Sequence, residues 1–315
     1  MAVLLAALLL PAVAGAAGGY RYPRFQPVSI ALLDARRGVL GEDDWTCRRV
    51  RGCKGQLLIT SDGGAHWRVT YTGARGVELF PVRGTPFLYA VAGEAMLESA
   101  DAGLHWQRLG WGPAEVSFVT SLHGWRLGRA TTLAHPPPLY ETRDGGRSWI
   151  TRTDPCRGDY GVPAALSFAS GAHGWIVCNT EATAGYQGKE IWMTSDGGSR
   201  WELRGRTHPI GPPEPKQQVG NLPGYGYPTG AAFLANGHGW LLQSRGNMLI
   251  TVDGGHTWQR SRLTQPDTIA AQSADLLTDR LGFVLLRGCT VRLVRTNLPA
   301  RTATTLDHWN SPAQC

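Results

Sequence analysis

Hydrophobic and polar residues alternate along this chain in short stretches that Gly-rich turns separate. In "VSFVT", for example, Val116, Phe118 and Thr120 fall on one face of an extended chain, and the residues between them fall on the other. Alternation with a period of two is typical of strands that bury one face. The sequence contains no convincing hydrophobic stripe of helical period. The pattern therefore predicts an all-β protein.

Two short motifs recur along these predicted strands. The first, S/T-x-D-x-G-x-x-W, is called the Asp–Trp motif below, and its five copies are 39, 43, 52 and 57 residues apart. Its residues are Asp62 and Trp67, Asp101 and Trp106, Asp144 and Trp149, Asp196 and Trp201, and Asp253 and Trp258. The second motif is Gly-Trp, which precedes the third, fourth and fifth copies in the stretches "HGWRLG", "HGWIVC" and "HGWLLQ". These spacings are near the length of a four-stranded propeller blade.

Each repeat unit therefore reads as strand, tight turn, strand, loop, strand, D-G-G turn, strand. A sixth unit ends in "TVRLVRTNLPART", where Asn297 replaces the motif Asp and the Trp is lost. Closing such units into a ring buries their faces and removes the sheet edges. We predict a six-bladed β-propeller from about residue 25 to 310. The alternative is a seven-bladed ring in which residues 19–27 supply part of the last blade.

The Asp–Trp motif is interpreted as a structural motif that holds the two outer strands of a blade together. Gly63, Gly64 and their repeats can take the positive φ of a tight connection, and the Asp carboxylate can accept N–H groups of its own turn. The Trp is expected to lie buried across the hairpin. A calcium site is disfavoured because the motif lacks a dense carboxylate pattern. His123, His173 and His238 recur at equivalent turns, far apart around a ring, so no metal and no cofactor is predicted.

The N-terminal residues 1–18 resemble a secretory signal peptide, because an apolar stretch is followed by A-x-A cleavage sequences. An uncleaved anchor is the alternative, and no later stretch is long and apolar enough to cross a membrane. Residues 19–315 would form one propeller domain in a secreted, periplasmic or cell-envelope protein. Six cysteines in an exported chain indicate disulfides, of which fifteen pairings are possible. Cys47 and Cys53 share one loop and are expected to pair, which leaves Cys156 with Cys178 and Cys289 with Cys315 as the natural remainder.

The formal charge of +7 comes from 31 Lys and Arg residues against 24 Asp and Glu. Nearly all the basic residues are Arg, and they are scattered, with no basic run longer than "CRRVRGCK". This distribution argues against nucleic acid binding. It leaves acidic partners open, such as a polyanionic glycan or an anionic lipid.

The Asp–Trp motif resembles the bacterial neuraminidase repeat, also called the Asp-box or BNR repeat, over nearly the whole mature chain. Such repeats occur in sialidases, in sortilin-type receptors and in photosystem II stability and assembly factors. The pairing of F-x-x-x-x-x-G-W with T-x-D-G-G-x-x-W is most similar to the assembly-factor group. In the photosynthetic members of that group the role is non-catalytic, and the propeller chaperones a membrane complex.

The sialidase resemblance extends to "YRYP" at residues 20–23, which is similar to the F/Y-R-I-P motif of those enzymes. It would make Arg21 a carboxylate ligand, with Asp43 or Asp44 as the acid. A sialidase also needs a Tyr nucleophile paired with a Glu, but residues 228–315 contain neither Tyr nor Glu. We therefore predict no catalytic residues. A glycan-binding or glycan-hydrolysing propeller is the alternative.

The loops differ in length in a way that suggests a binding face. The long loops are 41–56, 128–138, 151–163, 178–189 and 202–230, and propeller topology places all of them on one face. They contain the Trp, Tyr and Arg residues that commonly anchor interfaces. The candidate binding residues are Trp45, Arg48, Arg49, Arg51, Tyr160, Tyr186, Tyr225 and Tyr227. The alternative is that these side chains only anchor the long loops to the rest of the domain. We expect an envelope or extracellular protein to contact loops 41–56, 178–189 and 202–230, and a glycan is the other possible ligand.

Overall fold

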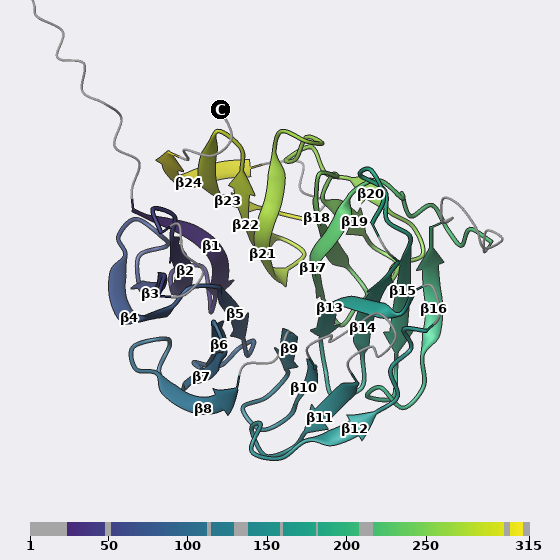
Figure 1. Cartoon of the computed structure of the whole chain (residues 1–315), viewed down its shortest axis with the longest axis horizontal. Helices are drawn as coiled ribbons and strands as arrows, with labels where there is room; N and C mark the ends of the chain where they lie inside the picture. The colour runs from purple at the N-terminus through teal and green to yellow at the C-terminus, as the bar shows by residue number, and fades with distance from the viewer. Residues whose placement is uncertain are drawn as a thin grey trace, which may run out of the picture.

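The computed structural model describes residues 24–47, 52–111, 115–128, 138–157, 160–180, 182–207, 217–298 and 303–310. These residues form six four-stranded antiparallel sheets arranged as a ring, without an α-helix (Figure 1). The six-bladed propeller predicted from the repeats is confirmed, and the seven-bladed alternative is wrong. The proposed signal peptide and Arg21 lie outside the described residues.

Each blade consists of four strands that are consecutive in the chain, so no blade mixes the two ends of the chain. The first two blades are β1 (Phe25–Leu32), β2 (Gly38–Asp44), β3 (Lys54–Thr60), β4 (Arg68–Ala74), and β5 (Val77–Pro81), β6 (Leu88–Ala92), β7 (Ala95–Ser99), β8 (Gln107–Trp111). The next two are β9 (Glu115–Phe118), β10 (Gly124–Leu127), β11 (Leu139–Thr142), β12 (Ile150–Arg152), and β13 (Val162–Phe168), β14 (Gly174–Asn179), β15 (Lys189–Thr194), β16 (Glu202–Arg206). The last two are β17 (Tyr227–Phe233), β18 (Gly239–Ser244), β19 (Leu249–Thr251), β20 (Gln259–Arg260), and β21 (Ala270–Thr278), β22 (Leu281–Arg287), β23 (Thr290–Thr296), β24 (Ala303–Asn310).

The first strand of each blade lies next to the central channel, and one of its edges has no strand partner. Side chains of the preceding blade supply acceptors there. Ser117 Oγ accepts a hydrogen bond from the Phe168 N–H at 2.8 Å. Asp275 of the sixth blade accepts one from the Leu32 N–H of the first at 2.9 Å, across the point where the ring closes. At these interfaces, side chains instead of a further strand supply acceptors for N–H groups of the inner edge.

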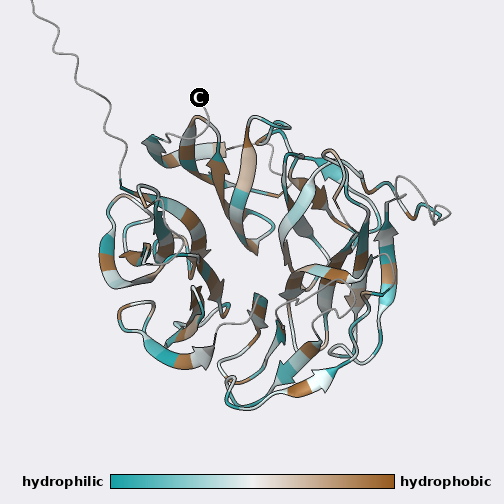
Figure 2. Ribbon diagram, in the orientation of Figure 1, coloured by the Kyte–Doolittle hydropathy of each residue, from teal (hydrophilic) through white to brown (hydrophobic). Residues whose placement is uncertain are grey.

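The hydrophobic core is divided among the blade interfaces. The described residues form six hydrophobic clusters, one between each pair of neighbouring blades. Hydrophobic positions accordingly recur in the strands all around the ring (Figure 2). At three interfaces an aromatic ring of a second strand stacks on a Phe of the next blade. The pairs are Tyr89–Phe118 (3.8 Å), Trp125–Phe168 (3.7 Å) and Trp175–Phe233 (4.5 Å).

Two of the three Gly-Trp tryptophans also reach the motif turn of the next blade. Their Nε1–H groups donate to a backbone carbonyl there, and the bonds are Trp125 to Gly197 and Trp175 to Gly254, each 3.1 Å. Trp240 faces the sixth blade, where Asn297 replaces the motif Asp. Its buried Nε1–H has no partner among the described residues. The loss of the sixth motif therefore leaves one buried donor without the acceptor that its counterparts have.

The motif turns have the hydrogen bonds that the sequence predicts. In the first blade the Thr60 hydroxyl accepts from the Gly64 N–H at 3.0 Å. The Asp62 carboxylate accepts from the Thr60 hydroxyl at 2.8 Å and from the His66 N–H at 3.0 Å. Gly63 and Gly64 have φ of 79° and 95°. The same pattern of bonds recurs in the other four turns.

The burial expected of the motif tryptophans is wrong for most of them. Only Trp258 is buried, at 5% exposure, whereas the other four are partly exposed. Those four sit at turns on the surface. Trp149, Trp201 and the buried Trp258 touch the first-strand Phe of their own blade edge-on. The fully buried tryptophans are Trp125, Trp175 and Trp240, which lie between blades. We therefore expect the Gly-Trp residues to contribute more to the stability of the ring than the motif tryptophans do.

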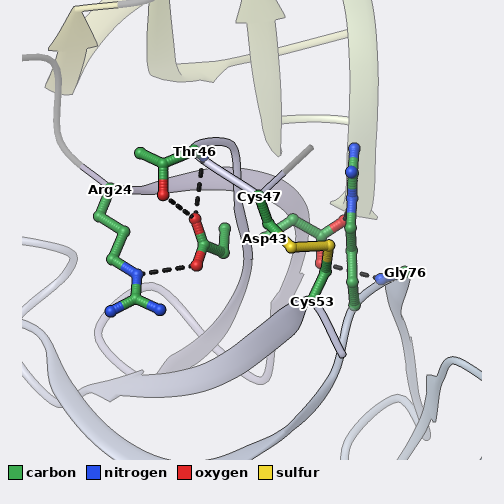
Figure 3. Close-up of a disulfide and its surroundings, with 8 residues drawn as sticks. Arg24, Asp43, Thr46, Cys47, Cys53 and Gly76 are labelled. Carbon is green, nitrogen blue, oxygen red and sulfur yellow. Dashed lines mark hydrogen bonds and ion pairs between the residues drawn. A yellow bond between two sulfur atoms is a disulfide. The ribbon is translucent and has the colours of Figure 1, made fainter. Parts of the chain in front are cut away.

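Two of the three expected disulfides are present. Cys47 pairs with Cys53 beside the end of β2 (Figure 3), and Cys156 pairs with Cys178. Cys315, the expected partner of Cys289, lies outside the described residues. None of the cysteines within the described ranges is a free thiol. The disulfides are compatible with an oxidising compartment.

Candidate functional site

The two faces of the ring are built from different connections. The motif turns lie on the same face as the turns between first and second strands. In the first blade the Gly63 N–H donates to the Arg36 carbonyl at 2.8 Å, and in the fourth Gly197 donates to Ala172 at 2.9 Å. The loops between second and third strands, and the connections between blades, lie on the opposite face. This opposite face is called the loop face below.

Three of the predicted binding residues meet on the loop face. The rings of Tyr186 and Tyr225 are 5.4 Å apart and nearly perpendicular. The Tyr225 hydroxyl donates to the Asp267 carboxylate, which also accepts from Arg245 Nε at 3.0 Å. The Tyr227 hydroxyl accepts a hydrogen bond from the Gly185 N–H at 2.8 Å. Tyr186, Tyr225, Tyr227, Arg245 and Asp267 are called the tyrosine surface below.

Backbone hydrogen bonds hold the two loops of this surface together. Within the β14–β15 loop, Thr183 and Tyr186 exchange two bonds of 2.8 Å. The Gln187 N–H donates to the Gly224 carbonyl at 3.0 Å, and another bond of 2.8 Å joins the Gly226 N–H to the Gly185 carbonyl. Tyr186 is nevertheless 43% exposed. The surface therefore presents an aromatic ring on a fixed backbone.

The β16–β17 connection is also tied to two blades. Val219 and Arg206 exchange two backbone bonds at the outer strand of the fourth blade. The Asn221 side chain accepts from the Trp258 N–H at 2.7 Å and donates to the Trp258 carbonyl at 3.1 Å. Leu222 is buried at the interface of the fourth and fifth blades. The part of this connection from Val219 to Leu222 is thus anchored to both blades.

Backbone strain is concentrated at the tyrosine surface. Of the non-glycine residues described, four have positive φ, and they are Ala102, Ala184, Arg245 and Asp267. The last two belong to the tyrosine surface, and Ala184 lies two residues before Tyr186. The left-handed region costs a non-glycine residue roughly 1–2 kcal/mol, less for Asp than for most. An exposed ion pair such as Arg245–Asp267 offsets little of that cost.

One end of the central channel lies on the same face and is called the channel mouth below. The channel encloses about 600 Å³ and is lined mainly by the first strands of the blades. At its rim the guanidinium carbons of Arg287 and Arg75 lie 4.3 and 5.8 Å from the centre of the Trp45 ring. Arg287 donates to Gln272 and to the Pro27 carbonyl, and burial lowers its pKa to about 10. Trp45, predicted from the sequence, is therefore a residue of the channel mouth.

The acidic residues near the channel mouth are engaged in structural contacts. Asp43 accepts from the Gly76 N–H at 2.9 Å (Figure 3), and burial raises its pKa. Asp44 pairs with Arg24 at 2.7 Å. Glu115 accepts from the Leu166 N–H at 3.3 Å. Burial, together with the neighbouring Glu78 carboxylate, raises the pKa of Glu115 to about 8.

A tyrosine–carboxylate pair does occur, although not where a sialidase would place it. Tyr225 and Asp267 form that pair at the tyrosine surface, and neither lines the channel. The hydrogen bond to Asp267 raises the pKa of the Tyr225 hydroxyl. A tyrosine nucleophile must lose its hydroxyl proton to become a phenolate, and a raised pKa makes that loss harder.

The other predicted site residues are not brought together. Tyr160 is fully buried, and its hydroxyl donates to the Thr207 carbonyl at 2.8 Å, so its assignment as an exposed binding residue is wrong. The β14–β15 loop and Thr207 cover Tyr160, whose side chain anchors a long connection to the core. Arg48, Arg49 and Arg51 lie outside the described residues.

The three recurring histidines are turn residues. His123 pairs with Glu141 and His238 with Asp279, each at 2.8 Å, and His173 contacts Ser170. In the part of the chain that the structure describes, no group of three or more His, Cys, Asp and Glu side chains could hold a metal ion. The same ranges contain no helix that could cross a membrane.

Comparison with known proteins gives a likeness of fold. No family model matches the chain, and no curated protein matches its sequence. A structure of YCF48 bound to a D1 peptide is 13% identical, with 90% of this chain and 84% of that chain covered and a TM-score of 0.49. The GH74 xyloglucanase of Xanthomonas campestris is 16% identical (90% and 47% covered, TM-score 0.50). The α-L-arabinofuranosidase Arb93A of Fusarium graminearum, with an iminosugar inhibitor, is 13% identical (86% and 90% covered, TM-score 0.54).

The two matches with TM-scores of 0.50 and 0.54 support the propeller fold, and identities this low leave the activity open. The neighbours include YCF48, a photosystem II assembly factor, as well as glycoside hydrolases.

Proposed function

We propose that this protein is an exported, non-catalytic propeller that binds another protein of the cell envelope through its loop face, as a scaffold or assembly factor. The tyrosine surface is the contact site in this proposal. The Trp45 and arginine groups of the channel mouth extend the contact area on the same face.

The observation that carries the proposal is the strain at an exposed surface. Two of the five side chains of the tyrosine surface sit on left-handed backbone, although their ion pair is half exposed. Such strain persists in native proteins mainly where it positions groups for a function. A rigid tyrosine cluster loses little entropy when a partner binds, which favours affinity.

The non-catalytic part of the proposal rests on the roles of the acids. Asp43 and Glu115 accept backbone hydrogen bonds, Asp44 is paired with an arginine, and Tyr225 is held protonated by Asp267. A glycosidase needs two carboxyl groups free to act on opposite sides of the scissile bond. These side chains are better explained by the architecture of the ring.

Glycan binding is the second candidate, favoured by one observation. The exposed Tyr186 ring lies beside Tyr225, whose hydroxyl bonds Asp267. A sugar could stack on such a ring and hydrogen-bond to the neighbouring carboxylate and guanidinium groups. A retained oligosaccharide would favour this candidate over a protein partner.

Photocrosslinking from two positions tests the proposal. A photoreactive residue replaces Tyr186 on the loop face or Leu104, which is 41% exposed at a motif turn on the other face. Crosslinking in cells of the native source is followed by mass spectrometry. We expect one envelope protein to be captured from position 186 and not from position 104. Capture from position 104 alone, or of no protein from either position, would contradict the proposal.

A further inference from the structure

A buried lysine lies beneath the tyrosine surface. Lys189 begins β15 and is one of only three lysines in the sequence. Its side chain is fully buried. Its Nζ donates to three backbone carbonyls: Gln187 at 3.0 Å, Pro223 at 3.1 Å and Gly224 at 2.8 Å. The amino group thus sits in a cage made only of carbonyl oxygens.

The cage joins the two loops of the tyrosine surface. Gln187 follows Tyr186 in the β14–β15 loop, while Pro223 and Gly224 directly precede Tyr225. The backbone of Lys189 is itself fixed to the fourth blade. Its N–H donates to the Thr207 hydroxyl at 2.7 Å, and its carbonyl accepts from the Thr207 N–H at 2.9 Å. The side chain therefore runs from a core strand to the point where the loops meet.

No described acid shares this environment with Lys189. Burial lowers its pKa to about 7, with no contribution from a neighbouring charge. On the surrounding elements, Glu190 pairs with Arg206, and Asp267 pairs with Arg245 and Tyr225. Tyr160 donates to Thr207, and the Tyr227 hydroxyl accepts from Gly185. A buried amine is costly, and apolar packing would suffice if the loops needed only volume.

We propose that Lys189 is a positioning residue of the tyrosine surface, whose amino group closes the carbonyl cage that fixes Tyr186 against Tyr225. The proposal rests on the proposed function in so far as this surface binds the partner. Without the amino group, the carbonyls of Pro223 and Gly224 lose a buried donor. Gly224 still accepts from the Gln187 N–H, whereas Pro223 can recover a donor only by turning towards water, which would move Tyr225.

Hydrogen exchange tests the proposal without any partner. The informative amides are Gln187, which donates to Gly224, and Gly226, which donates to Gly185. In Lys189→Ala we expect both to exchange about tenfold faster or more, while amides of the inner strands stay unchanged. Lys54→Ala, at an exposed lysine, is the matched control and should leave all of them unchanged.

Chemical rescue separates a positioning role from general packing. The atoms removed in Lys189→Ala correspond to n-propylamine, so propylammonium should restore slow exchange at Gln187 and Gly226 in a saturable manner. Propanol fills the same space without the three N–H donors and should restore little. If Lys189→Ala does not fold, Lys189→Met keeps the volume and should show the same fast exchange.

The outcomes distinguish the two proposals. Unchanged exchange at both amides in a folded variant would overturn the role of Lys189, as would rescue by propanol equal to that by propylammonium. Failure of both variants to fold would also overturn it, because Lys189 would then stabilise the whole ring. Faster exchange with unchanged binding of the crosslinked partner would support the role of Lys189 and contradict the tyrosine surface as the binding site.

Discussion

The two faces of the ring use the left-handed region of backbone conformation in different ways. In the five motif turns, the two residues that follow each Asp have positive φ, and all but Ala102 are glycine. At the tyrosine surface, positive φ falls on two non-glycine residues, Arg245 and Asp267, and also on the nearby Ala184. The motif turns are relaxed and repeated, as expected of parts that hold a fold together. The tyrosine surface is strained and occurs once, which is typical of a site that acts on something else.

The largest expected effect concerns which tryptophans hold the blades. Trp175→Ala should lower the free energy of unfolding by about 3–5 kcal/mol, because the side chain is fully buried and stacked on Phe233. Trp67→Ala should cost clearly less, since Trp67 is partly exposed at its motif turn. Denaturant unfolding of both variants measures the difference. Equal losses would mean that the motif tryptophans fasten the ring as strongly as the Gly-Trp residues.

The next effect is a pH dependence that comes from Lys189. The unfolded chain holds the lysine proton up to about pH 10.5, whereas the folded protein releases it near pH 7. Between these values the unfolded state binds more protons, so the contribution of Lys189 to stability increases as pH rises. The gain should reach up to about 4 kcal/mol between pH 7 and pH 10. Urea unfolding at a series of pH values measures the free energy of unfolding, and Lys189→Met should lack the increase. If the free energies of the parent and of Lys189→Met change in parallel with pH, the prediction is wrong.

Removing the rings of the tyrosine surface should affect binding and not folding. Tyr186→Ala combined with Tyr225→Ala is expected to weaken binding of the crosslinked partner roughly 10- to 100-fold, the usual range for interface hot spots. The melting temperature should stay close to that of the parent, because both side chains lie on the surface. Titration calorimetry and thermal unfolding give the two quantities. Leu104→Ala on the other face is the control and should change neither.

The smallest effect is expected at the one motif position that departs from glycine. Ala102→Gly relieves a φ of 63° in the second motif turn and should raise stability by up to about 1 kcal/mol, or leave it unchanged after the entropy cost of glycine. Partner binding should not change. A loss of stability, or a change in affinity, would show that the motif face is not simply relaxed.

The sequence predicts the features of the fold that depend on interactions between residues close together in the chain. The Thr60–Gly64 and Asp62–His66 bonds span four residues, so the repeated motif was enough to predict the turn. Period-two strands between such turns predict the blades, and the alternation of connections predicts the loop face. Cys47 and Cys53 were predictable because a short loop brings them close.

The sequence does not show what long-range packing determines. Whether a tryptophan is buried depends on the neighbouring blade, so the sequence does not show that the Gly-Trp residues are more buried than the motif tryptophans. Tyr160 reads as an exposed loop residue until the β14–β15 loop covers it. Asp267 meets Tyr225 across 42 positions of the chain, and Arg245 gives no signal of its positive φ. The sequence gives no sign of the carbonyl cage around Lys189, because Pro223 and Gly224 lie 34 and 35 positions further along the chain.

The most direct test of the central claim is the stability and partner affinity of Arg245→Gly. Glycine relieves the left-handed backbone at this position and removes the guanidinium from the tyrosine surface. We predict an unchanged or higher melting temperature together with binding at least about tenfold weaker. Binding equal to that of the parent, or a fall in melting temperature as large as that of Trp175→Ala, would contradict the claim that strain on the loop face is maintained for binding.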